Sequence, residues 1–370
     1  MAETAIISGT IFSRDLPGPA SRSWLRPAET ELEGIDGTPR SRQSRRFALV
    51  SASVCGATDD RELDGGRMAG NDRDGGAAPV QVRGTVLTVR RVDAYVAMTV
   101  VAPAIATRFR PGQFIAIAVG GPQSGMLARR TFSVHDVRPD HGGTVEFVFL
   151  PREPGAQWLA DCRSRDVLDV VGPLGRPFPV PRDAASCLLL GVGPGAAPLF
   201  ALASRLAERG SQTDYLLGAE SADRVFGALT ARRTGRSATI ATADGSLGSR
   251  GSVVDVLPTV LQQARTDVIY ASAPTAVLRP VCAMAGRYGI PVQALVSEPA
   301  MTCGTGLCMG CVLPAVGNDG VTRMVRACTE GPVFRGDLVR WDDVGTIPFD
   351  ALGAPGWKPK PASGERTHAS

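Results

Sequence analysis

Four cysteines near the C-terminal end of the chain have residue types and a spacing that could hold a metal cluster. They follow the pattern C-x4-C-x2-C, with a fourth cysteine after sixteen further residues, and they are Cys303, Cys308, Cys311 and Cys328. Four thiolates at such spacing are typical of loops that surround a 2Fe–2S cluster. Gly304, Gly306 and Gly310 lie among them, and glycine permits both positive φ angles and a close approach of the backbone to inorganic sulfur. The pattern predicts an iron–sulfur site.

A structural zinc site and disulfides are the alternatives for these thiols. Zinc ribbons usually contain two short cysteine knuckles, whereas here only Cys308 and Cys311 form one. Disulfides are less favoured because the start of the chain does not resemble a secretory signal. The spacing therefore favours iron–sulfur over zinc, and zinc over disulfides.

Length and composition limit the class of protein that must position these thiols. The chain has 370 residues, enough for two domains and additional segments, with 44% hydrophobic and 21% charged residues. The net charge is +4 and no long basic run is interleaved with aromatics, so nucleic-acid binding is not expected. The uncharged stretch at residues 184–204 contains Gly-Val-Gly-Pro-Gly, which favours a strand, a loop and a helix over a membrane span. We expect a cytoplasmic protein.

Residues 1–80 differ in composition from the rest of the chain. They are rich in Ser, Arg, Gly, Asp and Pro and show no sustained period of 2 or 3.6. Such a segment buries too little apolar surface to offset its conformational entropy, so we expect it to be disordered. A spurious extension upstream of Met68 is the alternative, and an organelle-targeting peptide is disfavoured by the many acidic residues.

Residues 81–182 have the pattern of a small antiparallel barrel. Short β-branched runs follow one another without helical periods, and a Pro-Gly turn at residues 111–112 separates two of them. The expected strands cover residues 83–89, 94–101, 115–119, 131–134, 145–150 and 167–171.

Residues 183–296 alternate between strands and helices, which predicts an α/β domain with a parallel sheet. A buried run at residues 187–190 enters a glycine-rich turn, and leucines at helical spacing follow until Gly210. Further strands are expected at residues 215–218, 238–241 and 268–270, and helices at 253–263 and 275–288.

Three stretches in these two regions could bind phosphates or a flat ring. Arg130, Thr131, Phe132 and Ser133 combine a cation, hydroxyls and an aromatic, although an ordinary edge strand is the alternative. A glycine turn into a short helix at residues 155–159 would suit a phosphate. Gly191, Gly193 and Gly195 lie between a strand and a helix, where bare backbone can approach a dinucleotide; this is not the six-residue Rossmann fingerprint, and a simple tight turn is the alternative.

Taken in order, these motifs resemble the ferredoxin-reductase superfamily, and more narrowly the electron-transfer subunits of dihydroorotate dehydrogenase B. The resemblance covers roughly residues 82–340. It rests on the motifs at residues 111–114 (PGQF), 130–133 (RTFS), 172–175 (GPLG), 191–195 (GVGPG), 244–251 (DGSLGSRG), 298–311 (EPAMTCGTGLCMGC) and 325–334 (VRACTEGPVF).

The resemblance implies an α+β multidomain protein: an antiparallel FAD-binding β-barrel (81–182), an α/β parallel-sheet NAD-binding domain (183–296), a small C-terminal 2Fe–2S segment (297–345) and a tail (346–370). It implies that FAD is bound by Arg130, Thr131, Phe132, Ser133, Leu150, Pro151, Arg152, Gly155 and Ala156. It implies that NAD lies at Gly191, Gly193 and Gly195, and that the four cysteines bind the cluster. No residue is expected to act as an acid–base catalyst.

The function implied is that of a flavin-dependent, NAD(P)-linked oxidoreductase subunit in pyrimidine biosynthesis. A partner subunit carrying FMN oxidises dihydroorotate, and electrons pass through 2Fe–2S and FAD to NAD+, in a heterotetramer with two copies of each subunit. The alternatives are an NAD(P)H:ferredoxin-type oxidoreductase subunit serving a hydrogenase, sulfide or sulfite enzyme, and a zinc-stabilised nucleotide-binding regulator. A flavin suits the task because it exchanges both single electrons and hydrides.

Two departures from the family pattern bear on the cofactor sites. Ser272-Ala273-Pro274 stands where the superfamily often has Cys-Gly-Pro, and Ala156 stands where a hydroxyl is usual. His135 and His141 are expected in surface or loop positions. The other cysteines, Cys55, Cys162, Cys187 and Cys282, are expected to be structural or incidental.

Overall fold

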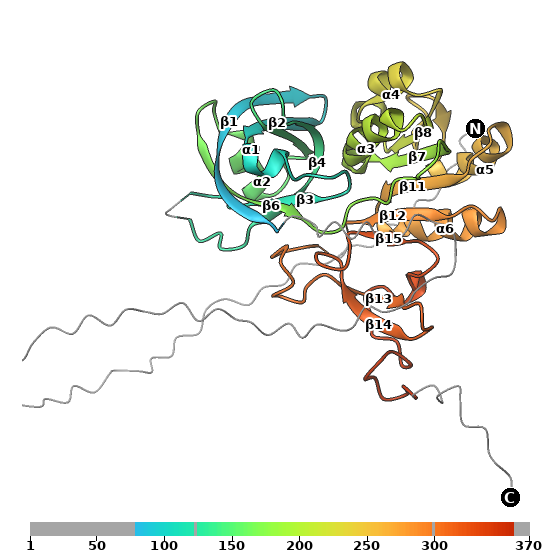
Figure 1. The fold of residues 1–370 in the computed structure, drawn as a ribbon. Helices are drawn as coiled ribbons and strands as arrows, with labels where there is room; N and C mark the ends of the chain where they lie inside the picture. Colours follow the sequence, from blue (N-terminus) through green and yellow to red (C-terminus); the bar gives the residue numbers. More distant parts are fainter. Residues whose placement is uncertain (1–77, 122–123, 298–299, 359–370) are drawn as a thin grey trace, which may run out of the picture. The chain divides into compact units, whose positions relative to one another are not determined.

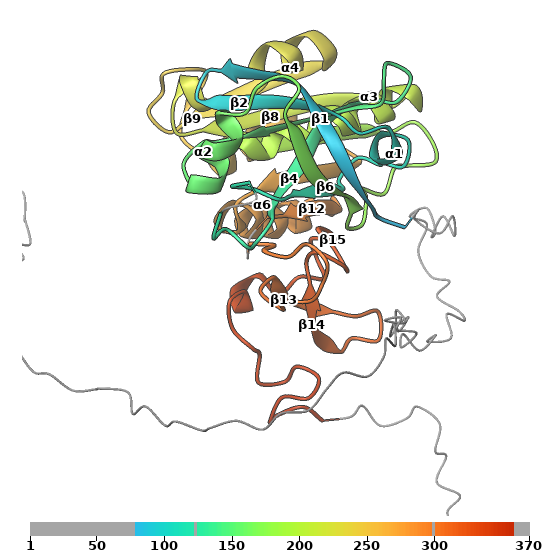
Figure 2. The same cartoon turned by 90° about the vertical axis from the view of Figure 1, so that its left-hand side faces the viewer.

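The computed structural model of this chain describes residues 78–121, 124–297 and 300–358. The predicted extension at residues 1–80 and the end of the predicted tail lie outside these ranges, apart from residues 78–80 and 346–358. Figures 1 and 2 show a barrel coloured blue to green, a sheet with helices coloured green to orange, and a C-terminal hairpin in red.

Six strands form a closed barrel in the order β1-β2-β5-β4-β3-β6, with every neighbouring pair antiparallel. The strands are β1 (Val80–Val92), β2 (Tyr95–Val101), β3 (Phe114–Ile117), β4 (Arg130–Arg138), β5 (Thr144–Phe149) and β6 (Val167–Leu174). The short helices α1 (Pro103–Ala106) and α2 (Pro154–Ala160) accompany them, of which only α2 is foreseen from the sequence. The prediction of an antiparallel barrel is confirmed.

Strand β4 has an inner and an outer face because successive side chains of a strand point in opposite directions. Phe132 packs inside the barrel, with ring centroids 4.9 Å from Phe147 and 5.4 Å from Phe149, and Val134 is fully buried. The alternation places Thr131 and Ser133 on the outer face, and His135, at a bulge between Val134 and Asp136, lies on the side that meets α3. This face is the one that can meet the rest of the molecule.

A seven-stranded sheet forms the α/β domain in the order β10-β9-β8-β7-β11-β12-β15. Its strands are β7 (Ser186–Val192), β8 (Gln212–Ala219), β9 (Ser237–Thr242), β10 (Ser249–Arg250), β11 (Val268–Ala273), β12 (Val292–Val296) and β15 (Val333–Arg335). All neighbouring pairs are parallel except β12 with β15. The predicted parallel sheet is confirmed, while β10, β12 and β15 are not foreseen from the sequence.

Helices cover both faces of this sheet, as the alternation along β7 requires. Leu188 and Leu190 pack with α5 (Val253–Gln263) and α6 (Thr275–Arg287), whereas Leu189 packs with α3 (Ala197–Glu208) and α4 (Ala228–Thr234). A strand that is buried on both faces has an unbroken run of apolar residues, so β7 can be identified from the sequence.

Helix α5 has the bounds expected from its sequence. The Ser252 side chain accepts a hydrogen bond from the Asp255 N–H, and the Asp255 carboxylate accepts one from the Ser252 N–H, so the helix begins with a capping box. This local signal explains why the start of α5 is predictable from sequence.

The C-terminal segment contains the antiparallel hairpin of β13 (Val312–Val316) and β14 (Thr322–Arg326), and it returns to the large sheet through β15. The residues after it stay attached: the Leu352 N–H donates to the Thr322 carbonyl at 2.8 Å, and Arg340 pairs with Asp350 at 2.6 Å. Residues 346–358 are therefore attached to this segment at Asp350 and Leu352, while Ile347 and Phe349 are exposed.

Three glycine-containing motifs, separate in the sequence, meet where the barrel joins this segment. The Arg176 N–H donates to the Gly331 carbonyl at 2.6 Å, and Gln113 Nε2 donates to the Gly175 carbonyl at 2.9 Å. A Cβ at Gly175, whose φ is +76°, would lie 2.9 Å from the Gly331 oxygen. Only glycine fits this close approach. These motifs join the cysteine segment to the end of the barrel.

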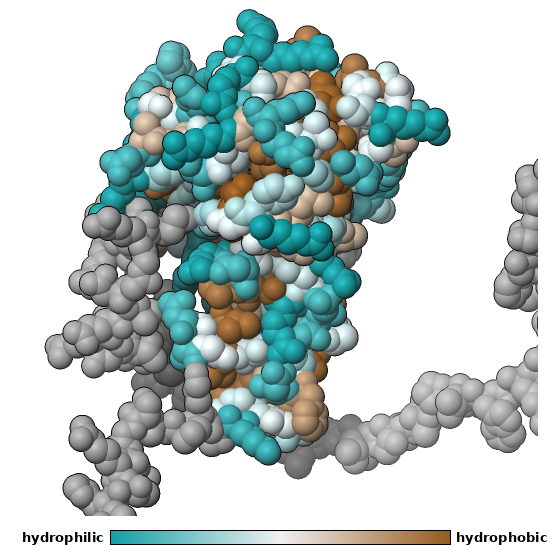
Figure 3. Space-filling model, turned by 90° about the vertical axis from the view of Figure 1, so that its right-hand side faces the viewer, coloured by the Kyte–Doolittle hydropathy of each residue, from teal (hydrophilic) through white to brown (hydrophobic). Residues whose placement is uncertain are grey.

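Within the described ranges, no helix has the length and hydrophobicity needed to cross a lipid bilayer. On the face seen in Figure 3, hydrophobic atoms occur in small areas separated by hydrophilic side chains.

Candidate functional site

The β13–β14 hairpin brings the fourth cysteine to the other three. Cys311 directly precedes β13, and Ala327 alone separates Cys328 from the end of β14. Val312 pairs with Arg326, and the Ala327 N–H donates to the Cys311 carbonyl at 2.9 Å. The Gly306 N–H then donates to Cys328 Sγ at 3.1 Å, which ties the distant cysteine to the loop.

Backbone N–H groups point at the sulfurs of the cysteine loop. The N–H groups of Thr305 and Cys308 both lie 3.4 Å from Cys303 Sγ, and the Gly310 N–H lies 3.5 Å from Cys308 Sγ. The loop can turn its amides inward because Gly304 has φ +71° and Gly306 has φ +82°. Burial raises the pKa of the Cys303 thiol, but these N–H donors outweigh it and lower the pKa to about 6. The loop is thus built to stabilise thiolate.

The four thiols fall into two pairs. The side chain of Cys303 contacts that of Cys308, and Cys328 contacts Cys311. Burial, followed by the neighbouring Cys311, raises the pKa of the Cys328 thiol to about 12. Among the described residues, no three Cys, His, Asp or Glu side chains converge as ligands of one metal ion. Two pairs suit a binuclear cluster, because each iron of a 2Fe–2S centre takes two protein ligands.

The four thiols differ in exposure, and none forms a disulfide. Cys311 and Cys328 are buried, Cys303 is half-buried and Cys308 is exposed. A cluster held by them would have one protected side and one side near the surface. The disulfide alternative is wrong for these residues.

Arg130 lies where β4 meets the start of α2. Its Nε is 3.1 Å from Glu153 Oε2, and a Cβ at Gly155 would lie 3.1 Å from the same nitrogen. The Glu153 side chain is 62% exposed, so its ion pair with Arg130 contributes only about 0–1 kcal/mol and can be exchanged for a diphosphate. The guanidinium and the Gly155 backbone fit an anionic group.

The other residues predicted to bind flavin differ in how far their side chains are buried. Phe132 is partly buried, and its ring packs against those of Phe147 and Phe149 in the barrel core. Ala156 is buried in the barrel core. Leu150 and Pro151 are partly buried and Arg152 is exposed, in a turn closed by an Arg152 N–H bond to the Leu150 carbonyl at 2.9 Å.

The glycine loop after β7 is shaped by close backbone contacts. A Cβ at Gly191 would lie 2.6 Å from Ala196 Cα, and one at Gly195 would lie 2.6 Å from the Ser272 carbonyl oxygen. Gly193 has φ +54°. Ser272 is buried at the end of β11, so the residue that departs from the family pattern borders this loop directly. Close packing within the protein therefore requires glycine at positions 191 and 195, whereas the Cβ position of Gly193 has no neighbour closer than 3.4 Å.

The outer face of β4 connects the two ends of the candidate site. At one end, a Cβ at Gly304 of the cysteine loop would lie 3.4 Å from Thr131 Cγ2. At the other end, His135 Nδ1 lies 3.0 Å from the carbonyl oxygen of Ala197, the first residue of α3. Ser133 lies between them. The strand therefore runs from the cysteine loop to the helix that follows the glycine loop.

The expectation of a surface or loop position is right for His141 and wrong for His135. His141 is exposed in the turn between β4 and β5, whereas His135 is a half-buried strand residue between the barrel and α3. Tyr95, which sequence reasoning also missed, is buried beside the glycine loop that follows β7. Its hydroxyl donates to the Arg224 carbonyl at 2.7 Å. No local pattern marks either residue, because each contact joins segments far apart in sequence.

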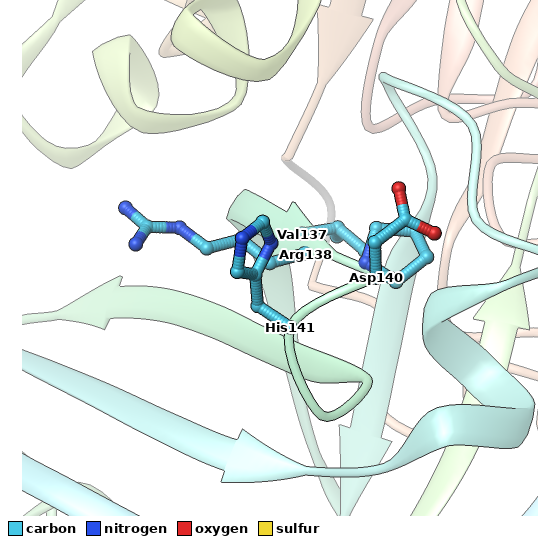
Figure 4. Close-up of a pocket in the computed structure, with 5 residues that line it drawn as sticks. Val137, Arg138, Asp140 and His141 are labelled. Atoms are coloured by element: carbon cyan, nitrogen blue, oxygen red, sulfur yellow. The ribbon is translucent and has the colours of Figure 1, made fainter.

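A separate hollow lies on the barrel, at the turn that follows β4. It has a volume of about 380 Å³ and is lined by Val137, Arg138, Pro139, Asp140 and His141. Figure 4 shows the Arg138 guanidinium and the Asp140 carboxylate pointing away from each other. The charged side chains of the hollow do not converge on one ligand. None of its lining residues belongs to the residues predicted to bind FAD, NAD or the cluster.

Residues 298–340 match the family model for the iron–sulfur cluster binding domain of dihydroorotate dehydrogenase B. This match confirms the iron–sulfur prediction for the cysteine segment over the zinc alternative. The dihydroorotate dehydrogenase B (NAD(+)) electron transfer subunit of Bacillus velezensis is 36% identical over 231 residues, which cover 62% of this chain and 86% of that protein. The subunit of the same name from Geobacillus kaustophilus is 35% identical over 235 residues, covering 62% and 87%.

Solved structures share the architecture. The NADH-dependent reduced ferredoxin–NADP oxidoreductase, studied for flavin-based electron bifurcation, is similar with a TM-score of 0.62 and 26% identity, covering 71% of this chain and 91% of its own. The ferredoxin reductase in carbazole 1,9a-dioxygenase has a TM-score of 0.50 at 20% identity, covering 58% and 69%, and supports the fold alone.

Proposed function

The chain belongs to the family of electron transfer subunits of dihydroorotate dehydrogenase B, and from this premise we propose that it passes electrons to NAD+ from an FMN-containing catalytic subunit that oxidises dihydroorotate. The route runs through a 2Fe–2S cluster and FAD and serves pyrimidine biosynthesis. At the level of the fold, the chain is a ferredoxin-reductase-like flavoprotein subunit with an iron–sulfur domain.

The observation that carries this proposal is the position of β4. Its outer face contacts the cysteine loop at Thr131 and the start of α3 at His135. A ring bound along this face would have the cluster loop on one side and the nucleotide loop on the other. That order is the one that a relay from single electrons to a hydride needs.

We assign the cluster to Cys303, Cys308, Cys311 and Cys328. Their paired arrangement, the inward N–H groups and the low pKa of Cys303 support this assignment. Neutral thiols must lose their protons when they bind iron, and N–H donors stabilise the resulting thiolates.

We assign FAD to the outer face of β4 and the turn before α2. Arg130 and the backbone at Gly155 would receive the diphosphate, with the backbone at Phe132 and Ala156, the side chains of Thr131 and Ser133, and the turn at Leu150, Pro151 and Arg152 around the remainder. NAD would lie at the loop of Gly191, Gly193 and Gly195, which leads from β7 into α3.

When bound, the cluster, FAD and NAD would supply redox chemistry that side chains lack. In the overall reaction dihydroorotate loses two electrons and two protons. NAD+ gains both electrons and one proton, and the other proton goes to water. The chain itself binds and aligns these groups. No acid–base catalyst is assigned in it. The domains proposed for these tasks are residues 81–182, 183–296 and 297–345.

The proposed assembly is a heterotetramer with two copies of this chain and two of the FMN subunit. We place it in the cytoplasm, since cluster-binding thiols need a reducing compartment.

Co-expression with an FMN-containing dihydroorotate dehydrogenase tests this function. The purified complex should contain iron and FAD and form NADH when dihydroorotate and NAD+ are supplied, whereas the FMN subunit alone should not. A chain that carries iron and FAD but neither binds the FMN subunit nor supports NADH formation would contradict the proposal.

A second function is favoured by one comparison, the similarity to the NADH-dependent reduced ferredoxin–NADP oxidoreductase. In this case the chain would exchange electrons with a ferredoxin or with a hydrogenase, sulfide or sulfite enzyme. NADH-dependent reduction of a ferredoxin by the chain without any FMN partner would support it, and failure of that reaction would leave the first function.

A further inference from the structure

His135 is held in a fixed orientation between the barrel and the α/β domain. Its Nδ1 lies 3.0 Å from the Ala197 carbonyl oxygen, and its ring meets two aromatic rings edge-on. The ring centroids are 5.5 Å from Phe200 at 76° and 5.0 Å from Phe226 at 83°. Phe200 belongs to α3 and Phe226 precedes α4, so one barrel side chain contacts two segments of the other domain.

The hydrogen bond sets the tautomer of the ring. A carbonyl oxygen can only accept, so Nδ1 of His135 carries the hydrogen and donates it to Ala197. The bonded carbonyl belongs to the first residue of α3, directly after the turn η1 (Gly193–Ala196). A displacement of this carbonyl would move the glycine loop as well.

Tyr95 makes a second contact of the same kind. From β2, its hydroxyl donates to the Arg224 carbonyl at 2.7 Å, and its ring is 5.8 Å from Phe226 at 86°. A Cβ at Gly193 would lie 3.4 Å from this hydroxyl. Two barrel strands therefore border the glycine loop, β2 at Gly193 through Tyr95 and β4 at Ala197 through His135.

We propose that His135 is a positioning residue for hydride transfer between the nicotinamide and the flavin. Through Ala197 it holds the glycine loop at a fixed place relative to Ser133, two residues away on β4. The inference rests on the proposed function. In that transfer a hydride, two electrons with one proton, leaves NADH for FAD, and a second proton is taken from water.

Two substitutions separate the hydrogen bond from the ring packing. His135→Asn keeps an N–H donor near the position of Nδ1 and removes the ring, whereas His135→Phe keeps an aromatic ring and removes the donor. His141→Asn is the matched control, because His141 belongs to the same hairpin and is exposed in its turn. A role in packing alone would make Asn the more damaging change, while a positioning role makes Phe the more damaging one.

The first measurement is the rate of FAD reduction by NADH in the full chain loaded with FAD and cluster. His135→Phe should slow this rate and weaken NAD+ binding by roughly three- to tenfold, the range for one lost hydrogen bond. His135→Asn should retain most of the rate, and His141→Asn all of it. Reduction of the cluster by dithionite should not change, since that reaction does not involve the nucleotide loop.

The second measurement is hydrogen exchange in the FAD-free chain, which does not depend on turnover. Amides of η1 and of the first turn of α3 should exchange faster in His135→Phe than in wild type, and remain protected in His135→Asn. Equal exchange in wild type and His135→Phe, or greater loss in Asn than in Phe, would overturn the proposal. If NADH does not reduce the FAD bound to the wild-type chain, the proposed function fails. The exchange measurement then still decides whether His135 positions the glycine loop.

Discussion

Gly304 of the cysteine loop packs directly on Thr131 of the barrel: a Cβ at Gly304 would lie 3.4 Å from Thr131 Cγ2. It would also lie 3.2 Å from Phe114 Cε2 and 3.3 Å from Leu174 Cδ1. The loop that holds three of the four cysteines therefore rests on β3, β4 and β6 and leaves little room for a side chain at Gly304. This contact couples cluster assembly to the barrel.

Gly304→Ala should destabilise this contact. Its φ of +71° is unfavourable for alanine, and the added methyl group would press on Phe114 and Leu174, so we expect a cost of about 1–2 kcal/mol. Gly289→Ala is the control, because Gly289 has φ +66° but nothing within 4 Å of its Cβ position. Thermal unfolding and iron content should fall further in Gly304→Ala than in the control. Equal losses would mean that the backbone angle, and not the contact with the barrel, is what matters.

Cys308→Ser should abolish cluster assembly and leave FAD bound. The Cys308 thiol is exposed, and the contact of the loop with Thr131 of β4, where FAD is proposed to bind, is made at Gly304. Iron analysis and the visible spectrum should show the loss of cluster absorption with the flavin bands retained. Cys162→Ser is the control, since Cys162 follows α2 and contacts the Trp158 carbonyl instead. A variant that keeps iron and loses FAD would refute this division.

Gly195→Ala should weaken NAD+ binding while FAD and iron stay bound. Its methyl group would lie 2.6 Å from the Ser272 carbonyl oxygen, so the loop or β11 must shift. Since every 1.4 kcal/mol is tenfold in affinity, we expect a loss of roughly tenfold in a titration with NAD+. Gly286→Ala, in α6 with nothing within 4 Å, should bind NAD+ like wild type. Unchanged affinity in Gly195→Ala would place the dinucleotide elsewhere.

Asp169 should give the barrel a specific sensitivity to acid. Hydrogen bonds from Arg129, and further from Gln81, hold the pKa of its carboxyl below the usual range although burial opposes them. A carboxyl with a lowered folded pKa stabilises the fold above its unfolded value of about 4, and this stability is lost as the pH falls through the folded pKa.

Asp169→Asn should therefore be less stable than wild type at neutral pH and lose less stability between pH 5 and pH 3. Urea unfolding at both pH values measures the difference. Asp140→Asn, in the exposed turn after β4, should keep the wild-type pH dependence. Parallel pH dependence in wild type and Asp169→Asn would show that the Arg129 pair does not stabilise the fold.

Much of the fold can be predicted from the sequence where the signal is local. The capping box at Ser252 sets the start of α5, and the apolar run that begins at Cys187 reveals a strand buried on both faces. Strand β15 escapes prediction because three residues carry too little pattern, and its place in the sheet depends on pairing with β12. Helix α4 escapes because its apolar face is short and a single buried residue, Ala231, anchors it.

The sequence by itself determined the cluster chemistry and the order of the domains. Cysteine spacing, glycine turns and hydrophobic periods act over a few residues, and their physical consequences do not depend on the rest of the chain. Only the tertiary structure decided that Cys328 joins the loop through a hairpin, that Phe132 faces inward, and that His135 reaches Ala197. These relationships depend on strand register and on packing between distant segments, which no local pattern specifies.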